Sequence, residues 1–186
     1  MKITTIILAL IAAGAAFAAG VDSGRMGVLK IIDSRASTRE FSSREIDDKT
    51  MGEILWAAFG KNSRGKRTIP TAKNSQNLKV YAIRAEGAFL YDGEKQVKVS
   101  DSDLRPLFAS QSYVMTAPLT LLFAGSDKQF SAMHAGSAYQ NVALYCAERG
   151  LGNVVRAYFD KEAIEKALGF SKDEFAIISQ TIGWGK

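Results

Sequence analysis

The stretch IPTAKNSQNLKVYAIR, residues 69–84, contains a polar loop that leads directly into a strand. In the loop, Thr71, Asn74 and Gln76 have side chains that both donate and accept hydrogen bonds. From residue 78 onward the sequence alternates in the manner of a strand. We therefore expect a rigid element to hold the loop and its polar groups in position to bind a ligand. Ordinary turn chemistry is the alternative, because Pro, Thr and Asn are common in loops of every kind.

Helices and strands alternate on both sides of this stretch. A 3.6-residue apolar period predicts a helix that Asp47 or Asp48 caps and Gly60 ends, and a polar, basic loop follows it. The other expected elements are a short helix at 28–33, a hairpin of 89–91 and 96–99 around Asp92-Gly93, a strand at 119–124 covered on both faces, a helix from 131 or 136 to 149, a strand at 153–159, a helix at 161–168 and a strand at 174–183. This order predicts one compact α+β domain over residues 28–186.

The first residues have the layout of a secretory signal peptide. A positive start at Lys2 precedes an apolar stretch, and Ala16-Phe17-Ala18 forms an Ala-x-Ala cleavage pattern. We expect residues 1–18 to be removed and the protein to be exported, to the periplasm or the medium. A retained membrane anchor is the alternative, although the apolar stretch is shorter than the roughly 20 residues of a membrane span.

Composition narrows the class of protein. The hydrophobic fraction of 47% and the formal net charge of +5 are those of a globular domain, and no basic stripe interleaved with aromatic residues indicates a nucleic-acid binder. The single cysteine, Cys146, lies in an apolar helical run and is expected to be a buried structural thiol. The pattern contains no metal-ligand cluster and no dinucleotide-binding glycine motif.

A basic turn near the start of the domain is suited to an anion. Arg35, Ser37 and Arg39 alternate along the chain, so in an extended turn all three point to one side. Arginine pairs with phosphate through parallel charge-assisted hydrogen bonds, and serine adds a neutral donor. A solvated basic link between two helices is the alternative.

The end of the long predicted helix, at Gly150-Leu151-Gly152-Asn153, is the third segment of interest. Glycines at this point allow a close approach of the backbone to a ligand. In the simpler interpretation Gly150 is only a helix C-cap, and Gln140 and Asn141 in the helix only satisfy buried backbone groups.

In their order and spacing these segments resemble the nitroreductase family of FMN-dependent oxidoreductases, from about residue 28 to 185. The resemblance implies a mixed sheet flanked by helices and an intertwined homodimer with FMN at the interface, each ring touched by both chains. Asn77 and Leu78 depart from the proline and aromatic residue usual in the family, which affects the fine shape of the ring pocket.

The same resemblance assigns roles to individual residues. Segment 35–39 would hold the flavin phosphate and pyrimidine edge, loop 70–76 would add contacts to the ring edge, and a backbone N–H at 152–153 would reach flavin N5. The implied cofactor-binding residues are Arg35, Ala36, Ser37, Arg39, Thr71, Asn74, Gln76, Gly152, Asn153 and Lys186. No residue receives a catalytic role, and His134 is expected at a helix start or on the surface.

The activity that this resemblance implies is a ping-pong hydride transfer through flavin N5. The donor would be NAD(P)H or another reductant, and the acceptor a quinone or a nitroaromatic compound. Export favours a donor other than NAD(P)H, such as a membrane quinol or a partner protein. Two other classes stay open: a flavin dehydrogenase that oxidises a peptide-derived ring, and a non-catalytic flavin- or small-ligand-binding protein of the same fold.

Overall fold

The structure is a computed structural model, and it describes residues 27–186. The predicted signal peptide, residues 1–18, lies outside the described residues. Among residues 27–186 no helix combines the length and the hydropathy that crossing a membrane requires. Helix α2 (Gly27–Ser34) belongs to a separate unit from residues 35–186, and it exposes apolar Val28, Leu29 and Ile32.

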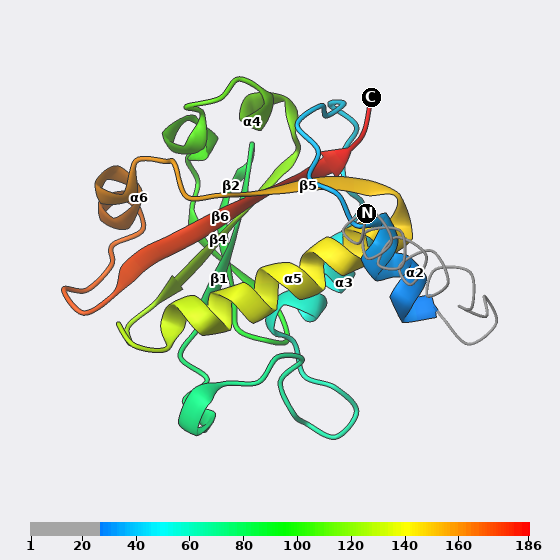
Figure 1. The fold of residues 1–186 in the computed structure, drawn as a ribbon. Coiled ribbons are helices and arrows are strands. Elements are labelled where there is room, and N and C mark those ends of the chain that lie inside the picture. The colour runs from blue at the N-terminus through cyan, green and yellow to red at the C-terminus, as the bar shows by residue number, and fades with distance from the viewer. Residues whose placement is uncertain (1–26) are drawn as a thin grey trace, which may run out of the picture. The chain divides into compact units, whose positions relative to one another are not determined.

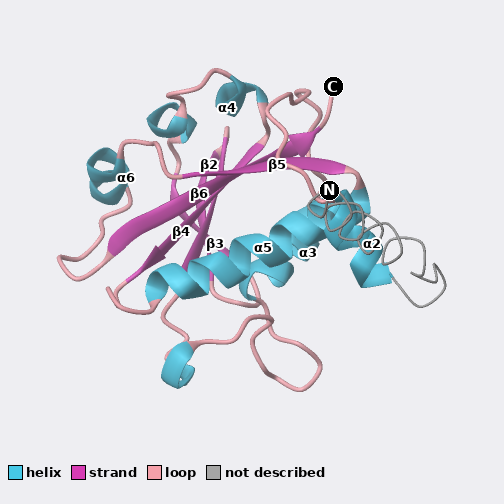
Figure 2. Ribbon diagram, in the orientation of Figure 1, coloured by secondary structure: helices cyan, strands magenta, loops and turns pink. Residues whose placement is uncertain are grey.

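The unit of residues 35–186 is one sheet flanked by helices (Figures 1 and 2). Its elements are α3 (Asp48–Phe59), η1 (Ala72–Asn74), β1 (Lys79–Arg84), β2 (Gly87–Tyr91), β3 (Gln96–Ser100), η2 (Arg105–Phe108), α4 (Tyr113–Thr116), β4 (Leu119–Gly125), α5 (Ser131–Arg149), β5 (Leu151–Arg156), α6 (Lys161–Ala167) and β6 (Phe175–Trp184).

The six strands form a single sheet in the order β3-β2-β1-β4-β6-β5. Neighbouring strands among the described residues are antiparallel at each of the five pairings. The first four strands therefore form a hairpin-based half, and β6 returns beside β4 to bring the chain's end next to β5. The predicted α+β class and the helix-flanked sheet are confirmed, with antiparallel pairing throughout the described part of the sheet.

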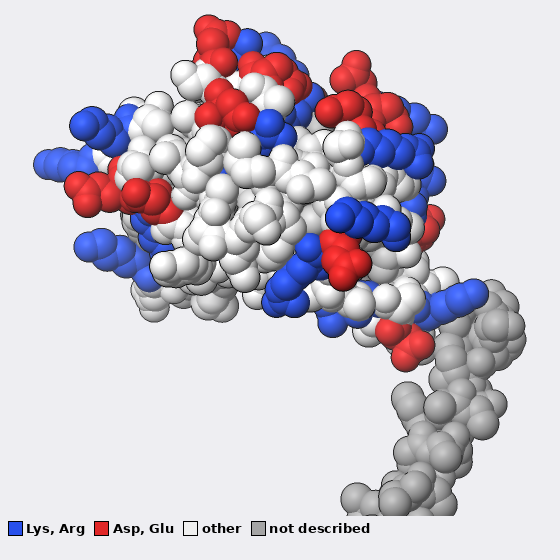
Figure 3. Space-filling view, turned by 90° about the horizontal axis from the view of Figure 1, so that it is seen from above, with Lys and Arg blue, Asp and Glu red and all other residues white. Residues whose placement is uncertain are grey.

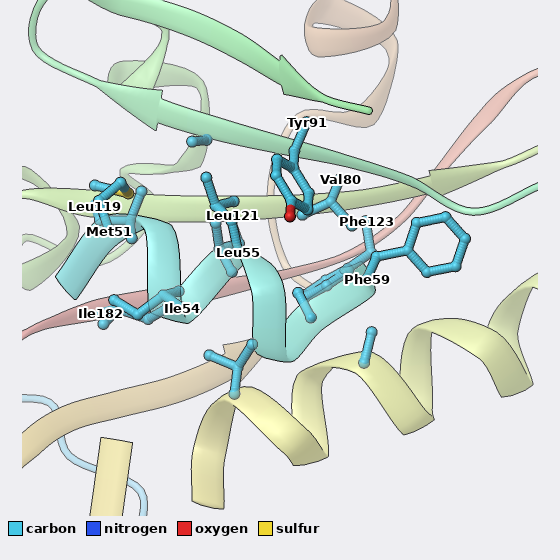
Figure 4. Packing of buried hydrophobic residues seen from close by; sticks show 14 of the residues in the cluster. Met51, Ile54, Leu55, Phe59, Val80, Tyr91, Leu119, Leu121, Phe123 and Ile182 are labelled. Carbon is cyan, nitrogen blue, oxygen red and sulfur yellow. The ribbon is translucent and has the colours of Figure 1, made fainter. Parts of the chain in front are cut away.

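Helices α3 and α5 cover one face of the sheet. Met51, Ile54, Leu55 and Phe59 recur at helical spacing on α3 and are each 2% exposed or less. Figure 4 shows these four side chains packed against strand residues, which are Val80, Tyr91, Leu119, Leu121, Phe123 and Ile182. Asp47 caps α3 by accepting a hydrogen bond from the Thr50 N–H at 2.8 Å, as the sequence predicts.

The segments η2, α4 and α6 cover the opposite face. Phe108, Val114 and Ile164 are fully buried there against Tyr81, Ile83 and Leu122 of the sheet. Strand β4 has helices over both faces, and all seven of its residues are buried. The continuous apolar run of residues 119–124 is therefore explained, as the sequence predicts, by a strand that is covered on both faces.

Most expected elements are present, with shifts at their ends. The strand expected at 153–159 is β5, which begins at Leu151 directly after the helix and ends at Arg156. The sequence analysis missed η1, η2 and α4, each of which has only three or four residues. Such short turns present too few positions for an apolar period to be visible.

Candidate functional site

Residues 35–42 lie along the ends of β5 and β6. The Thr38 N–H donates to the Asn153 carbonyl at 2.8 Å, and the Ser42 N–H donates to the Trp184 carbonyl at 2.8 Å. Phe41 also forms an antiparallel bridge with Gly185. The chain thus places the predicted residues of segment 35–39 beside Gly152 and Asn153, and close to the chain end at Lys186.

Several side chains at this end of the sheet are free to meet an anion. Ala36, Ser37, Arg39 and Lys186 are exposed, and Arg35 is partly buried. Within residues 27–186 no carboxylate forms an ion pair with any of these three cations. We call Arg35, Ser37, Arg39 and Lys186 the cation cluster, because this donor set suits a phosphate.

Phe41 anchors the backbone that carries the cation cluster. Its ring is 1% exposed, packs with Ala117 and Val154, and lies 5.9 Å from the Tyr113 ring between centroids. A Cβ at Gly152 would meet Thr38 at 3.1 Å and Phe41 at 3.2 Å. The close approach that Gly152 allows is therefore to residues of its own chain.

The side chain of Asn153 is buried in the sheet rather than exposed with the cations. Its Oδ1 accepts a hydrogen bond from Gln180 Nε2 at 2.9 Å, and the same nitrogen donates to the Tyr139 carbonyl of α5. At the site Asn153 contributes its backbone carbonyl, which holds Thr38. Gly150 is the left-handed C-cap of α5, with φ 71°, as the simpler interpretation of that glycine predicted.

The polar loop, residues 70–77, has an unusual backbone. Lys73, Asn74 and Gln76 all have positive φ, between 47° and 54°, although none of them is glycine. Each such residue is disfavoured by about 1–3 kcal/mol, so surrounding contacts must hold the loop in place. This kind of strain gathers at functional sites, and sequence patterns give no sign of it.

Side chains of the polar loop line a hollow of about 330 Å³. Gln76 Nε2 donates to Asn74 Oδ1 at 3.0 Å, and Arg67 Nε donates to Gln76 Oε1 at 3.1 Å. The lining residues are Gly65, Lys66, Arg67, Thr68, Ile69, Pro70, Thr71, Asn74 and Gln76. Thr71, Asn74 and Gln76 therefore lie around one space.

Arg67 is a residue of this hollow that the sequence analysis did not single out. Its guanidinium lies 4.2 Å from the Phe59 ring centroid and donates from Nη1 to the Phe59 carbonyl at 2.9 Å. A side chain at Gly93 would collide with it, so the β2–β3 turn closes over the guanidinium. The basic loop at 61–67 was the available signal, but it did not distinguish Arg67 from its solvated neighbours.

The cation cluster and the polar loop lie at opposite ends of helix α5. The Ala72 N–H donates to His134 Nε2, near the beginning of α5, whereas Gly152 follows the end of that helix. His134 and Arg149 are 15 positions apart, which is about 22 Å along a helix. Figure 1 shows α5 extended across the sheet between these two regions. A single chain therefore does not bring the two sets of predicted residues around one small ligand.

Three residues of α5 have identifiable structural roles. Asn141 Nδ2 donates to the carbonyls of Ala57 and Thr68, each at 3.2 Å, which is the backbone-satisfying role that the sequence left open for it. Cys146 is fully buried, and burial raises the pKa of its thiol to about 12, so it is the inert core thiol expected. His134 lies at the start of α5, which is one of the two positions expected for it, and it is only 2% exposed, so the surface alternative does not apply.

On the face seen in Figure 3, Lys and Arg side chains are interspersed with Asp and Glu side chains around an uncharged centre. This face therefore has no broad basic surface of the kind that binds nucleic acid.

Three comparisons with known proteins agree on one family. The sequence model of the Nitroreductase family matches residues 32–184. A candidate nitroreductase from Methanocaldococcus jannaschii is 29% identical over 160 residues, which are 73% of this chain and 81% of that protein. A candidate nitroreductase from Ralstonia eutropha JMP134 has a crystal structure that matches with a TM-score of 0.78 at 33% identity, covering 84% of this chain and 81% of the other.

The fold also occurs in a chain of a microcin synthetase complex. The Escherichia coli microcin synthetase McbBCD complex, solved with truncated pro-MccB17 bound, contains a chain that matches with a TM-score of 0.70 at 17% identity. The match covers 79% of this chain and 67% of that chain. At this identity the similarity concerns the fold alone.

Proposed function

Because this chain belongs to the nitroreductase family, we propose that it is an FMN-dependent oxidoreductase that works in two half-reactions at one site. The family and the fold support a flavin-type oxidoreductase. The donor in our proposal is NAD(P)H or another hydride donor, and the acceptor is a quinone or nitroaromatic compound. FMN, when bound, supplies the hydride chemistry, which protein side chains cannot provide.

The residues present fit the chemical groups of FMN. The phosphate requires cations and hydroxyl donors, which the cation cluster offers in the partly buried Arg35 and the exposed Ser37, Arg39 and Lys186. The edge of the ring requires groups that both donate and accept, which Thr71, Asn74 and Gln76 provide. The strongest single support is the backbone pairing of Thr38 with Asn153, since it holds the arginine-bearing segment against the end of the sheet.

Each group of residues has its own task in this proposal. Arg35, Arg39 and Lys186 bind the phosphate and set the position of the cofactor. Thr71, Asn74 and Gln76 orient the ring edge through hydrogen bonds. Gly152 and Asn153 act through their backbone, because Gly152 gives Thr38 and Phe41 room to approach and the Asn153 carbonyl holds Thr38.

The separation of the two groups supports a homodimer. The cation cluster and the polar loop are about one α5 length apart in one chain, so we propose that FMN lies at a dimer interface between the cluster of one copy and the loop of the other. The outer side of α3 and α5 offers surface for such an interface: Trp56 is 49% exposed and borders a hollow of about 380 Å³ with Leu144 and Tyr145. Met133 of α5 is 64% exposed.

Export is also part of the proposal. With residues 1–18 removed, the protein would work outside the cytoplasm, where a quinol or a redox partner replaces NAD(P)H as donor. N-terminal sequencing of the protein from cell fractions tests this: Ala19 at the N-terminus in the periplasm or medium supports export, and an intact Met1 in the cytoplasm contradicts it.

The test of function is an absorbance spectrum of the purified protein with added FMN, followed by anaerobic NADH and then a reduced quinone. Retention of flavin through gel filtration, with bleaching by either donor, is the expected result. Flavin that stays bound and is bleached by neither donor would favour the non-catalytic alternative. Absence of flavin binding would contradict the proposal.

A further inference from the structure

The only histidine of the chain is buried beside the polar loop, and its contacts suggest a task. His134 is 2% exposed, and its Nε2 accepts a hydrogen bond from the Ala72 N–H at 2.8 Å across 62 positions of sequence. An imidazole nitrogen that accepts carries no proton, so a neutral His134 has its proton on Nδ1. Nδ1 is buried and has no hydrogen-bond partner among residues 27–186.

A buried Nδ1–H without a partner lowers the free energy of unfolding, and an apolar side chain of similar size would fill the same space without that penalty. Packing therefore does not explain a histidine at this position. The bond from Ala72 to Nε2 is the one interaction of the ring that an apolar residue could not make.

The turn that leads into α5 fixes the position of the imidazole. Asp127 Oδ1 accepts hydrogen bonds from the N–H groups of Gln129 and Phe130, and Ser131 Oγ accepts from the Asp127 N–H. A Cβ on Gly125 would lie 2.3 Å from Ser131 Oγ, so the strand end and the helix start are in close contact. His134 follows one turn later and projects from this rigid corner.

The polar loop depends on few attachments. Within residues 27–186, hydrogen bonds from outside the loop reach it at two points: His134 binds the backbone at Ala72, and Arg67 binds the side chain of Gln76. The other hydrogen bonds of the loop are internal, such as the Asn74 N–H to the Thr71 carbonyl at 3.1 Å. His134 is thus the side chain that binds the backbone of the loop, at Ala72. Lys73 and Asn74, which have disfavoured positive φ, come directly after Ala72 in the chain.

We propose that His134 is a positioning residue: its neutral imidazole anchors Ala72 and thereby holds the strained polar loop in the shape that presents Asn74 and Gln76 to the flavin. The part of this inference that concerns flavin rests on the proposed function. The anchor itself does not, because the hydrogen bond belongs to the protein alone.

Substitutions of the ring separate anchoring from packing. His134→Gln keeps an acceptor oxygen near the position of Nε2, whereas His134→Phe keeps the ring volume and removes the acceptor. We expect His134→Phe to raise the FMN dissociation constant about tenfold, the change that one lost hydrogen bond of typical strength produces, and His134→Gln to stay within about threefold of wild type. Cys146→Ala, a buried change in the second half of the same helix, is the matched control and leaves FMN affinity unaltered.

Equal FMN affinity for wild type and His134→Phe would overturn the proposal, as would an equal loss in both His134 variants. Nuclear magnetic resonance of ¹⁵N-labelled wild type tests the anchor without flavin: a coupling between the Ala72 nitrogen and His134 Nε2, with the ring proton on Nδ1, is the expected result. Absence of that coupling with the proton on Nε2 contradicts the anchor even if FMN binds. Failure of wild type to bind FMN would contradict the proposed function and leave the coupling as the test of the anchor.

Discussion

The two ends of helix α5 carry the two halves of the proposed flavin site, and they are built differently. The cation cluster lies on backbone that is paired with the ends of β5 and β6, with no positive φ in residues 35–42 and a buried Phe41 behind it. The polar loop has three disfavoured backbone conformations and is tied to the rest of the chain by His134 and Arg67. The sheet holds the backbone of the cation cluster in place, whereas hydrogen bonds from individual side chains hold the polar loop.

This difference teaches where each half is vulnerable. Substitutions in the cation cluster remove charge but leave the sheet-paired backbone in place, so they change binding and not shape. Substitutions around the polar loop change shape as well as contacts.

Removal of both arginines of the cation cluster has the largest expected effect. Each charge-assisted hydrogen bond contributes about 1.5–3 kcal/mol, so Arg35→Ala with Arg39→Ala should weaken FMN binding by roughly a hundredfold or more, with the fold intact. Fluorescence titration of FMN measures this, and circular dichroism checks the fold. Lys166→Ala with Lys172→Ala removes the same charge from exposed positions near α6 and should bind FMN normally. Equal affinities in the two double variants would remove the arginines from the site.

At Asn74 the contribution of the amide side chain to FMN binding can be separated from the cost of the positive φ by two substitutions. Asn74→Ala removes the side chain and keeps the positive φ unfavourable, whereas Asn74→Gly removes the side chain and relieves that backbone by about 1 kcal/mol. Both should weaken FMN about tenfold if the amide contacts the ring, and only Asn74→Gly should raise thermal stability. Titration and thermal melting measure the two effects. A loss of affinity in Asn74→Ala that Asn74→Gly restores would show that shape, and not the amide, is what the flavin requires.

Glu174 lies away from both the cation cluster and the polar loop, and its substitution has the smallest expected effect. Its carboxylate accepts hydrogen bonds from Lys79 and from the Ser171 N–H, and the Lys79 contact is the main cause that holds its pKa below the usual value. Because the folded pKa is depressed, the stabilisation is present above the unfolded pKa near 4.5 and is lost as the pH falls through the folded value. Since Lys79 is partly exposed, Glu174→Gln should lower the free energy of unfolding by about 0.5–1 kcal/mol at pH 7. The difference should shrink as the pH falls below 4.5 and vanish below the folded pKa.

Urea unfolding of wild type and Glu174→Gln at several pH values measures this difference. FMN affinity should be unaltered in the variant. A changed affinity would mean that the β1–β6 corner influences the polar loop, and a difference that does not shrink as the pH falls below 4.5 would contradict the carboxylate as its cause.

More of the fold than of the site could be predicted from the sequence. The apolar pattern located α3, β4, α5 and β6, for example through a 3.6-residue period in α3 and a continuous run in β4, because long elements present many positions. It also grouped Arg35 with Arg39 and Thr71 with Asn74, since these pairs are close along the chain. It could not find Arg67 or the role of His134, because both depend on contacts between residues far apart in sequence.

Gly152 and Asn153 illustrate the same limit. The glycine was expected to make room for a ligand, and in the chain it makes room for Thr38 and Phe41. Asn153 was expected to approach a ligand together with Gly152, and its side chain is buried against Gln180. A glycine or an asparagine after a helix gives no information about which neighbour approaches it.

The measurement that tests the central idea most directly is flavin binding by a mixed dimer. Two variants are co-expressed with different tags: Arg35→Ala with Arg39→Ala, and Asn74→Ala with Gln76→Ala. If each site combines the cation cluster of one copy with the polar loop of the other, the doubly tagged dimer has one intact site and one doubly defective site. It should retain about one FMN per two chains, while neither parent retains any. A site built within one chain leaves both sites of the mixed dimer defective, so a doubly tagged dimer without FMN would contradict the account.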